Sequence, residues 1–394
     1  MAGWVERRGE NTWRLNVPGG TDSEGRRVVY RKRVQASSER EARRLLNLFA
    51  AEVLRGEYVQ PARLTLRQFA DRWLRDHVDP QLAPRTAHRY RQVLARACDA
   101  LGHYRLDQLK PLHFVEFYNG LRQEGSRKDG KAGRLSEASV LYHHRVLSKM
   151  FADAVRWGIL AVNPLAKVDP PRARSQQAPS YDESQVAALL AALEDEPLQY
   201  RTMVVLALAT GLRRGELVGL EWRDVDFAAG TITVQRAVCY VPGRGVFTKE
   251  PKTASSRRTL SVPPSVMALL KQHRAAQLEN RLRVGDLWKG SDRVFCSWDG
   301  APMHPDTISS WWPDFLRRHG LPHIKFHALR HTSATLLIAQ GVPLKSVAAR
   351  LGHADIRTTA NIYAAALRSA DEEAAARLDR ILSGHGRPAR PHPR

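Results

Sequence analysis

The stretch that decides the fold of the last half of the chain is Thr210-Gly-Leu-Arg213-Arg-Gly-Glu216-Leu-Val-Gly-Leu-Glu-Trp222. Residues 203–209, directly before it, are all apolar, which predicts a buried helix that ends at the first glycine of the quoted stretch. Arg213 follows the Gly-Leu turn. Because a tight turn after a buried helix fixes where the next side chain lies, we expect Arg213 to belong to a site and not to be an ordinary surface arginine.

Three further stretches carry residues suited to chemistry. Two short β-type runs, Thr231–Gln235 and Arg258–Val262, flank a loop with glycine and proline, which predicts a small antiparallel sheet among helices. His327 and Arg330 have the spacing of one helix face. The three stretches are Pro251-Lys252-Thr253 in the loop, Phe326-His327-Ala-Leu-Arg330-His331-Thr332, and Leu351-Gly-His353-Ala-Asp-Ile-Arg-Thr-Thr-Ala-Asn-Ile-Tyr363.

The chain is strongly basic. Its 394 residues carry 62 Lys and Arg against 40 Asp and Glu, a formal net charge of +22, and the excess is densest in residues 61–177. A basic excess spread in this way indicates a clamp that follows nucleic-acid phosphates rather than one basic tail. The N-terminus lacks an apolar signal segment, and the longest uncharged apolar stretch, Met203–Leu212, is too short to cross a bilayer. We therefore expect a cytoplasmic protein without a membrane partner.

The N-terminal residues have the pattern of a small sheet with one helix. β-type runs at Trp13–Val17 and Arg27–Val34 are separated by turn-forming residues. A helix follows, with Ser38 and Glu41 at the spacing of a capping box. The break at residues 60–61 ends this pattern, which predicts a separate module.

Beyond that break the pattern is mostly helical. Apolar positions repeat with helical period from Leu66, Pro84 opens a second helix, and the last unit begins at another capping-box pair, Ser180 with Glu183. The chain is therefore predicted to be mainly α with small antiparallel β elements. The expected parts are a module over 1–60, a helical domain over 61–168, a Pro-rich linker over 169–179, a mostly helical domain over 180–382, and a disordered basic tail over 383–394.

No pattern indicates a metal or cofactor. Residues 125–132 approach a nucleotide-binding P-loop, but alanine stands at the position of the required Ser or Thr, which indicates a flexible basic loop. His327 and His331 are four apart without a following Glu or a thiolate partner. We expect His143 and His144 to be solvent-facing. The three cysteines are too far apart to predict a disulfide framework or a zinc site: Cys98, Cys239 and Cys296.

Together and in this order, the four quoted stretches resemble the tyrosine recombinases, the phage-integrase family of site-specific DNA recombinases. The family pattern is Arg, Lys, His-x-x-Arg, His or Trp, and Tyr. The resemblance covers nearly the whole chain and implies an arm-type DNA-binding module over 1–60, a SAM-like core-binding domain over 61–168 and a catalytic domain with a β-hairpin over 180–382. The pattern falls on Arg213, Lys252, His327, Arg330, His353 and Tyr363.

The resemblance also implies how these residues act on a DNA phosphodiester. Arg213 and Arg330 would contact the non-bridging oxygens while negative charge builds around phosphorus. Tyr363 would be the nucleophile that forms a covalent 3′-phosphotyrosine, with His327 as the base and His353 as a further hydrogen-bond donor to phosphate. Neither ATP nor a metal ion is required, because the phosphotyrosine is itself a phosphodiester.

Lys252 is the expected general acid for the leaving 5′-oxygen, and Lys249 in the same loop is the open alternative. The chain departs from the family at two places. Ala328 stands where Asp usually follows the His, and residues 364–366 are alanines where a His is common. Neither position carries a proton or a phosphate contact in the family mechanism, so efficiency or packing is affected more than activity.

The resemblance implies double-stranded DNA with core and arm-type sites as the partner, a homo-tetramer on two duplexes, and an accessory DNA-bending or directionality protein. The segment Asp371–Leu382 would dock on a neighbouring protomer, and the reaction would integrate or excise a phage or another mobile element. A type IB topoisomerase and a non-catalytic DNA-binding regulator remain alternatives. The first sheet is expected to lie in a major groove with alternate side chains facing the DNA, and the basic residues that it bears are Arg26, Arg27, Arg31, Lys32 and Arg33.

Overall fold

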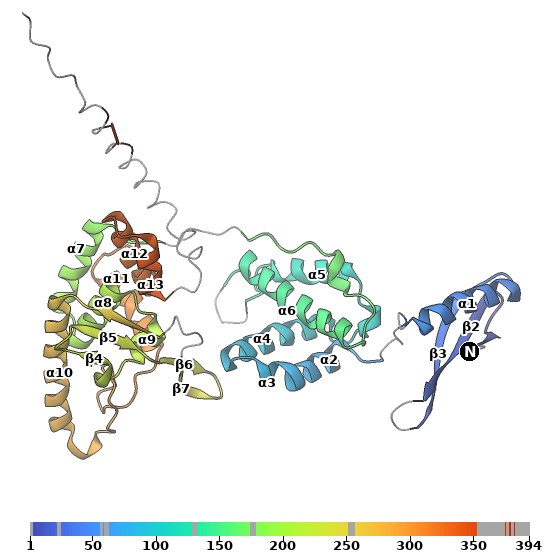
Figure 1. Ribbon diagram of the computed structural model, residues 1–394, viewed down its shortest axis with the longest axis horizontal. Coiled ribbons are helices and arrows are strands. Elements are labelled where there is room, and N and C mark those ends of the chain that lie inside the picture. The colour runs from blue at the N-terminus through green and yellow to red at the C-terminus, as the bar shows by residue number, and fades with distance from the viewer. Residues whose placement is uncertain are drawn as a thin grey trace, which may run out of the picture. The chain divides into compact units, whose positions relative to one another are not determined.

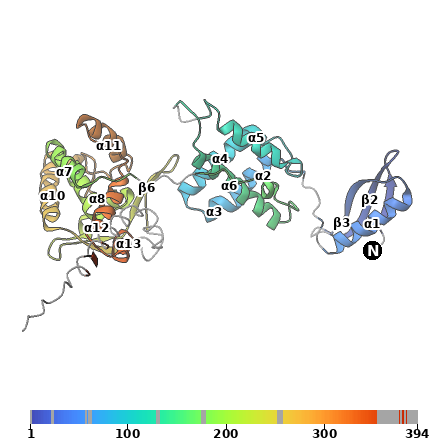
Figure 2. The same ribbon diagram turned by 90° about the horizontal axis from the view of Figure 1, so that it is seen from above.

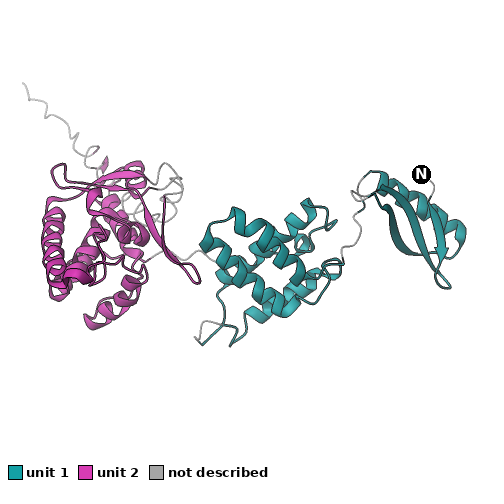
Figure 3. Ribbon diagram, turned by 90° about the horizontal axis from the view of Figure 1, so that it is seen from below, with its two compact units in different colours: residues 1–175 teal, residues 176–394 magenta. Residues whose placement is uncertain are grey.

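The computed structural model describes residues 3–21, 25–55, 58, 63–127, 132–173, 179–250 and 257–352, together with Ala375, Leu378, Asp379 and Leu382. The chain divides into two compact units, residues 1–175 and residues 176–394 (Figure 3). Each unit has hydrophobic cores of its own. The two units are described separately below.

Unit 1 begins with a three-stranded antiparallel sheet in the order β1-β2-β3. A single helix, α1, packs across one face of this sheet (Figures 1 and 2). Leu15 and Val17 of β2 are buried against Leu46 and Phe49 of α1, so alternate residues of the strand form the core. The bounds are β1 Trp4–Arg7, β2 Thr12–Thr21, β3 Arg27–Gln35 and α1 Glu39–Leu54.

The pairing register decides which basic residues of β3 face away from α1. Arg33 pairs with Arg14 and Arg31 pairs with Asn16, so these side chains lie on the face of the sheet that α1 does not cover. Lys32, which alternates with them along the strand, faces α1 instead. Lys32 pairs with Leu15, and its Nζ lies 2.8 Å from a carboxylate oxygen of Glu52 in α1.

The predicted cap of α1 is half correct. The Ser38 side chain accepts a hydrogen bond from the backbone N–H of Glu41 at 3.3 Å. The Glu41 carboxylate accepts from Ser37 instead, from the backbone N–H at 2.8 Å and from the hydroxyl at 2.6 Å. The reciprocal bond of a full capping box is therefore displaced by one residue.

The rest of unit 1 is helical around a second core. Helix α2 begins with a full capping box between Thr65 and Gln68 that the sequence analysis missed. Pro84 opens α4 as predicted. The elements are α2 Leu66–Trp73, a π-helical segment Leu74–Val78, α3 Asp79–Gln81, α4 Pro84–Leu101, α5 Pro111–Leu121 and α6 Glu137–Arg156, with short 3-10 helices at Leu106–Gln108 and Pro164–Lys167.

The prediction that His143 and His144 face solvent is wrong, because α6 is packed on most of its circumference. Both side chains are buried. Nδ1 of His143 lies 2.8 Å from the carbonyl oxygen of Ser139, and Nδ1 of His144 lies 3.1 Å from the hydroxyl of Tyr118. Burial lowers the pKa of both histidines, so each imidazole is neutral at neutral pH.

Unit 2 is mostly helical, and its central helix α8 packs against α10 and α12 (Figure 1). The helices are α7 Glu183–Ala192, α8 Leu198–Thr210, α9 Arg214–Val218, α10 Pro264–Val284, α11 Thr307–Arg318, α12 Ala328–Ala339 and α13 Leu344–Leu351, with 3-10 turns at Leu193–Asp195, Trp222–Asp224 and Gly285–Leu287. The strands are β4 Val225–Asp226, β5 Thr231–Val234, β6 Ala237–Val241, β7 Gly245–Lys249 and β8 Arg258–Ser261.

The predicted sheet is present, but the chain between its two strands is more ordered than expected. β5 and β8 pair antiparallel, and β4 adds to the other edge of β5. The connecting chain, expected as a loop, contains a separate hairpin of β6 and β7. This hairpin projects from the body of unit 2 (Figure 3).

The predicted start of unit 2's first helix is wrong by two residues. Asp182, not Ser180, caps α7, in a full capping box with Gln185. Both pairs have the capping spacing, so tertiary contacts decide between them. The backbone N–H of Tyr181 donates to the hydroxyl of Thr332 in α12, which ties the chain down directly before Asp182.

Candidate active site

Arg213 lies in the turn between α8 and α9. Gly211 ends α8 in the left-handed conformation, with φ of 65°, and its N–H donates to the carbonyl of Ala207. Glycine suits this position because a Cβ is strained at positive φ. Arg213 then takes an extended backbone and caps α9, with 38% of its side chain exposed. The predicted turn and the predicted arginine position are both present.

Arg330 approaches the same turn from α12. Its side chain is buried, with 3% of the residue exposed. One guanidinium nitrogen, Nη1, donates to the carbonyl of Gly211 at 2.7 Å, and the other, Nη2, donates to the carbonyl of Leu351 at 2.7 Å. The fork of this arginine therefore joins the end of α8 to the end of α13.

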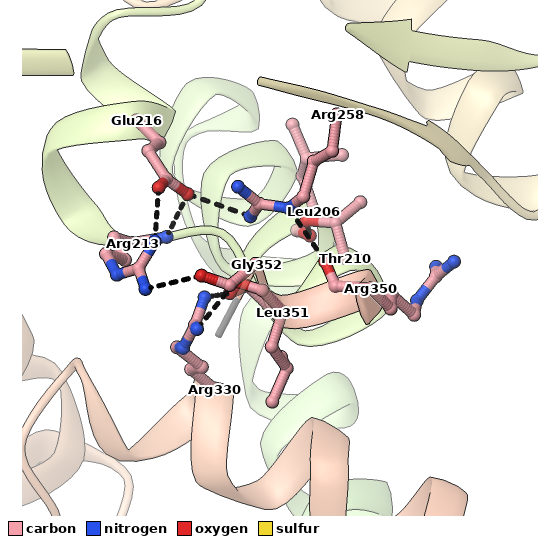
Figure 4. A network of polar contacts seen from close by, with 10 residues as sticks. Leu206, Thr210, Arg213, Glu216, Arg258, Arg330, Arg350, Leu351 and Gly352 are labelled. Carbon is pink, nitrogen blue, oxygen red and sulfur yellow. Dashed lines mark hydrogen bonds and ion pairs between the residues drawn. The ribbon is translucent and has the colours of Figure 1, made fainter. Parts of the chain in front are cut away.

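The two arginines converge on neighbouring carbonyls at the C-terminus of α13 (Figure 4). Arg330 holds the carbonyl of Leu351, and Nη2 of Arg213 donates to the carbonyl of Gly352 at 3.2 Å. The last carbonyls of a helix lack partners within the helix and favour positive charge. The two guanidiniums thus hold the two backbone carbonyls that directly precede His353.

Glu216 fixes Arg213 from the other side. Its carboxylate accepts from the backbone N–H of Arg213 at 3.0 Å and from Nη1 of the same residue at 2.7 Å. Burial raises the pKa of the Glu216 carboxyl, but hydrogen bonds and positive charge from Arg258 and Arg213 outweigh it and lower the pKa below its usual value. Glu216 is therefore a carboxylate at neutral pH.

His327 directly precedes α12 and borders this cluster. Its ring lies edge-on to His331, with 5.4 Å between the ring centroids. The side chain reaches solvent, yet the surrounding protein and the neighbouring His331, Arg330 and Arg213 lower the pKa of His327 to about 4. At neutral pH the imidazole is uncharged and can accept a proton.

The β6–β7 hairpin is anchored close to the Arg213 turn. A Cβ on Gly215 of α9 would lie 2.7 Å from the carbonyl oxygen of Val238 in β6, so glycine permits this close approach. Arg293 bridges the body and the hairpin, since it donates to the carbonyl of Gly219 and to the hydroxyl of Thr248. The hairpin whose second strand, β7, directly precedes the chain segment with Lys252 is therefore tied to the body of unit 2 near Arg213.

Of the six predicted residues, the structure brings Arg213, His327 and Arg330 together. Lys252, His353 and Tyr363 lie outside the described residues, as does most of the segment Asp371–Leu382. Lys249 is not in a loop as expected, because it is the last residue of β7 and pairs with Ala237.

A basic hollow lies between α4 and α6 in unit 1, within the most positively charged third of the sequence. It has a volume of about 410 Å³ and is lined by Arg89 and Arg96 of α4 and Tyr142 of α6, among others. Arg89 lies over the ring of Tyr142, 4.2 Å from its centroid. Nη1 of Arg96 is buried without a hydrogen-bond partner among the described residues. Such a surface suits a phosphate group.

Sequence reasoning missed two members of the cluster around Arg213. Glu216 was quoted in the motif but given no role, although its spacing of three residues from Arg213 matches the reciprocal bonds seen here. Arg258 was assigned only to a strand. No local pattern identifies Arg258, because its partners lie elsewhere in the sequence.

Comparison with known proteins identifies the family. The chain is 30% identical over 388 residues to the tyrosine recombinase XerC-like protein of Caldanaerobacter subterraneus subsp. tengcongensis, and the match covers 91% of this chain and 93% of that protein. The chain belongs to the phage integrase family of tyrosine recombinases. Residues 180–369 of the recombinase match the phage integrase family, and residues 65–122 match the phage integrase N-terminal SAM-like domain. The protein is therefore a site-specific DNA recombinase, an enzyme that breaks and rejoins DNA.

Further relatives and solved structures agree with this fold. The recombinase is 29% identical over 248 residues to the ICEBs1 integrase of Bacillus subtilis, over 63% of this chain and 67% of that protein. The Tn1549 transposon integrase in complex with transposon right end DNA has a TM-score of 0.65 at 21% identity and covers 79% of this chain and 100% of its own. A lambda integrase tetramer bound to a Holliday junction has a TM-score of 0.57 at 18% identity, with 91% and 94% covered. The predicted fold class is confirmed.

The described residues contain neither a membrane-spanning helix nor a cluster of metal ligands. Among them, no helix of the recombinase is long and apolar enough to cross a membrane. No group of three or more His, Cys, Asp or Glu side chains in the same part of the chain is placed to hold a metal ion.

Proposed function

We propose that the recombinase holds the scissile phosphate of double-stranded DNA between Arg213 and Arg330 and attacks it with Tyr363. The observation that carries this proposal is the convergence of both guanidiniums on the carbonyls directly before His353. Fixed positive charge at that place stabilises the charge that builds on the non-bridging oxygens during attack. Arg330 is buried and held by backbone carbonyls, so little reorganisation is needed when the phosphate arrives.

The remaining residues move protons. A tyrosine with a pKa near 10 is mostly protonated at neutral pH, so its attack requires a base or a strong positive field. The neutral imidazole of His327 accepts the phenol proton, and His353 donates a hydrogen bond to a phosphate oxygen. Lys252 protonates the leaving 5′-oxygen of deoxyribose. The P–O bond to that oxygen breaks as the bond to tyrosine forms, and the 3′-phosphotyrosine keeps the phosphodiester for rejoining without ATP or a metal ion.

The chain is divided into two DNA-binding parts, a linker and a catalytic domain. The distribution of basic residues along the sequence supports this division. Residues 61–168 form the core-binding domain, whose hollow between α4 and α6 receives backbone phosphate through Arg89 and Arg96. Residues 1–60 form the arm-binding module, in which the sheet face with Arg14, Arg31 and Arg33 enters a major groove. Residues 169–179 link these to the catalytic domain over 180–382, and residues 383–394 are a basic tail.

On the DNA, the recombinase assembles as a tetramer on two duplexes, with the segment Asp371–Leu382 docked on a neighbouring protomer. An accessory DNA-bending or directionality protein determines whether the reaction integrates or excises a phage or another mobile element. Support for the assembly comes from the lambda integrase, which is similar in fold and was solved as a tetramer on a Holliday junction.

The test is strand exchange between two duplexes that carry a site recovered by selection for binding to the chain from random-sequence DNA. The assay contains EDTA and no ATP. The proposal predicts recombinant products and a protein–DNA adduct that survives denaturation. Relaxation of supercoiled DNA without strand exchange would indicate a topoisomerase, and binding without any adduct would indicate a regulator; either result contradicts the proposal.

A further inference from the structure

Arg258, the first residue of β8, lies beside the predicted catalytic arginines without being one of them. Its side chain is 7% exposed. Its Nη2 lies 2.9 Å from Oε2 of Glu216, and its Nε donates to the carbonyl of Arg350 at 2.7 Å (Figure 4). One planar guanidinium therefore contacts two different segments of unit 2.

The first of these contacts acts on Arg213. Glu216 is itself 7% exposed, and its carboxylate is shared between Arg258 on one side and the backbone and guanidinium of Arg213 on the other. A buried carboxylate without a compensating charge is costly, so Glu216 needs Arg258 to remain ionised and in place. The position of Arg213 thus depends on Arg258 through a single intermediate side chain.

The second contact acts on the end of α13. Three consecutive carbonyls there are each held by one arginine (Figure 4). The carbonyl of Arg350 accepts a hydrogen bond from Arg258, that of Leu351 from Arg330, and that of Gly352 from Arg213. Two of these arginines are predicted to bind the scissile phosphate, and the third belongs to the strand that directly follows the segment with Lys252. The same three carbonyls lead into His353.

We propose that Arg258 is a positioning residue for DNA cleavage: it holds Glu216, and through Glu216 Arg213, in register with the end of α13. This inference rests on the proposed role of Arg213 at the scissile phosphate. Arg258 does not touch the phosphate. It sets the distance between the turn that carries Arg213 and the chain that enters His353.

Two substitutions distinguish a positioning role in cleavage from a general contribution to the stability of the fold. Arg258→Met removes both contacts and leaves Glu216 without one of its two cationic partners. Arg258→Lys keeps the charge but lacks the planar fork, so it does not reproduce both bonds in their present directions. The matched control is Arg257→Met, because Arg257 is the adjacent arginine, with 61% of its side chain exposed and an exposed partner, Glu250.

The readout is single-turnover cleavage of one selected duplex with three chemistries at the scissile position. The first is the ordinary phosphodiester. The second is a methylphosphonate, which lacks one charged non-bridging oxygen and so depends less on Arg213. The third is a 5′-bridging phosphorothiolate, whose sulfur leaves without a proton and so depends less on Lys252.

For Arg258→Met we expect a loss of about 100-fold on the phosphodiester, as follows from displacing a phosphate-binding group by about 1 Å. The loss should be clearly smaller on the methylphosphonate. On the phosphorothiolate it should be as large as on the ordinary phosphodiester. Arg258→Lys should show smaller losses that rank the three substrates in the same way. Arg257→Met should cleave all three substrates at the rate of the unchanged chain. Binding of the duplex should change little.

Three results would overturn the inference. The first is cleavage by Arg258→Met at the rate of the unchanged chain. The second is an equal loss on the phosphodiester and the methylphosphonate. The third is rescue by the phosphorothiolate, which would mean that the substitution acts through Lys252. If Arg258→Met does not fold by circular dichroism, the Arg258→Lys ratios decide. Absence of any adduct with the unchanged chain would instead refute the proposed function, so the two failures are distinguishable.

Discussion

Replacing Gly211 by alanine tests whether the turn before Arg213 is held as tightly as its contacts indicate. Gly211 has φ of 65°, and a Cβ at this position would lie 2.5 Å from Cδ2 of Leu351. Leu351 is fully buried in a small core with Ala334, Ile338 and Val347, so it has no open space to move into. The substitution should therefore disturb the end of α8 and the end of α13 together.

The magnitude has two parts. An L-residue in the left-handed conformation costs about 1–2 kcal/mol. Overpacking of a buried site costs about 1–3 kcal/mol more. Gly230 isolates the first part, because it has φ of 64° in the same unit and a Cβ there would meet no atom within 4 Å. Gly211→Ala should therefore destabilise its surroundings by about 1–3 kcal/mol more than Gly230→Ala does.

Hydrogen exchange measured by mass spectrometry gives this difference locally, which matters in a chain with several domains. Relative to the unchanged chain, Gly211→Ala should speed exchange in peptides from α8 and α13 about 5- to 150-fold more than Gly230→Ala speeds exchange in peptides from β4 and β5. Cleavage should fall in Gly211→Ala alone, because this turn carries Arg213. An equal increase in exchange in the two variants would refute the claim that Leu351 and the Arg213 turn are tightly packed.

Three further predictions concern the proton-transfer residues and the first module. Lys252→Ala should slow cleavage strongly on normal DNA and be largely rescued by a 5′-bridging phosphorothiolate; equal defects on both substrates would point to Lys249, tested by the same pair of substrates. Because the pKa of His327 is about 4 and not 6.5, protonation should inactivate the free enzyme only at low pH. The acid limb of cleavage at subsaturating DNA should thus lie near pH 4, and a limb between about pH 6 and 7 would contradict the lowered pKa of His327. A chain lacking residues 1–60 should still cleave, recombine poorly, and bind DNA with a smaller salt slope, because fewer counterions are released; loss of cleavage with the fold intact would argue against a separate module.

Local sequence patterns were sufficient for the features that depend on near neighbours. An apolar run followed by glycine specifies the end of α8 and hence the position of Arg213, since the cap is made within one turn of helix. The helices that start at Leu66 and Pro84, and the extended conformation of β5 and β8, follow from equally local patterns.

The features that escaped prediction depend on residues far apart in the sequence. Glu216 of α9 meets Arg258 of β8 only because the chain comes back toward Glu216 after the β6–β7 hairpin. The side chains of His143 and His144 are buried because neighbouring helices surround α6, which the periodicity of α6 alone does not reveal. Lys32 turns toward α1 because it pairs with Leu15 of β2, whose side chain packs against the same helix.

The most direct test of the central claim is to identify the atom that becomes linked to DNA. A selected duplex with a 5′-bridging phosphorothiolate traps the covalent complex, which is then digested with nuclease and protease and analysed by mass spectrometry. We expect a nucleotide 3′-phosphate attached to Tyr363, and no adduct when the same experiment is made with Tyr363→Phe at matched DNA binding. A phosphate attached to any other residue, or an adduct that persists in Tyr363→Phe, would contradict it.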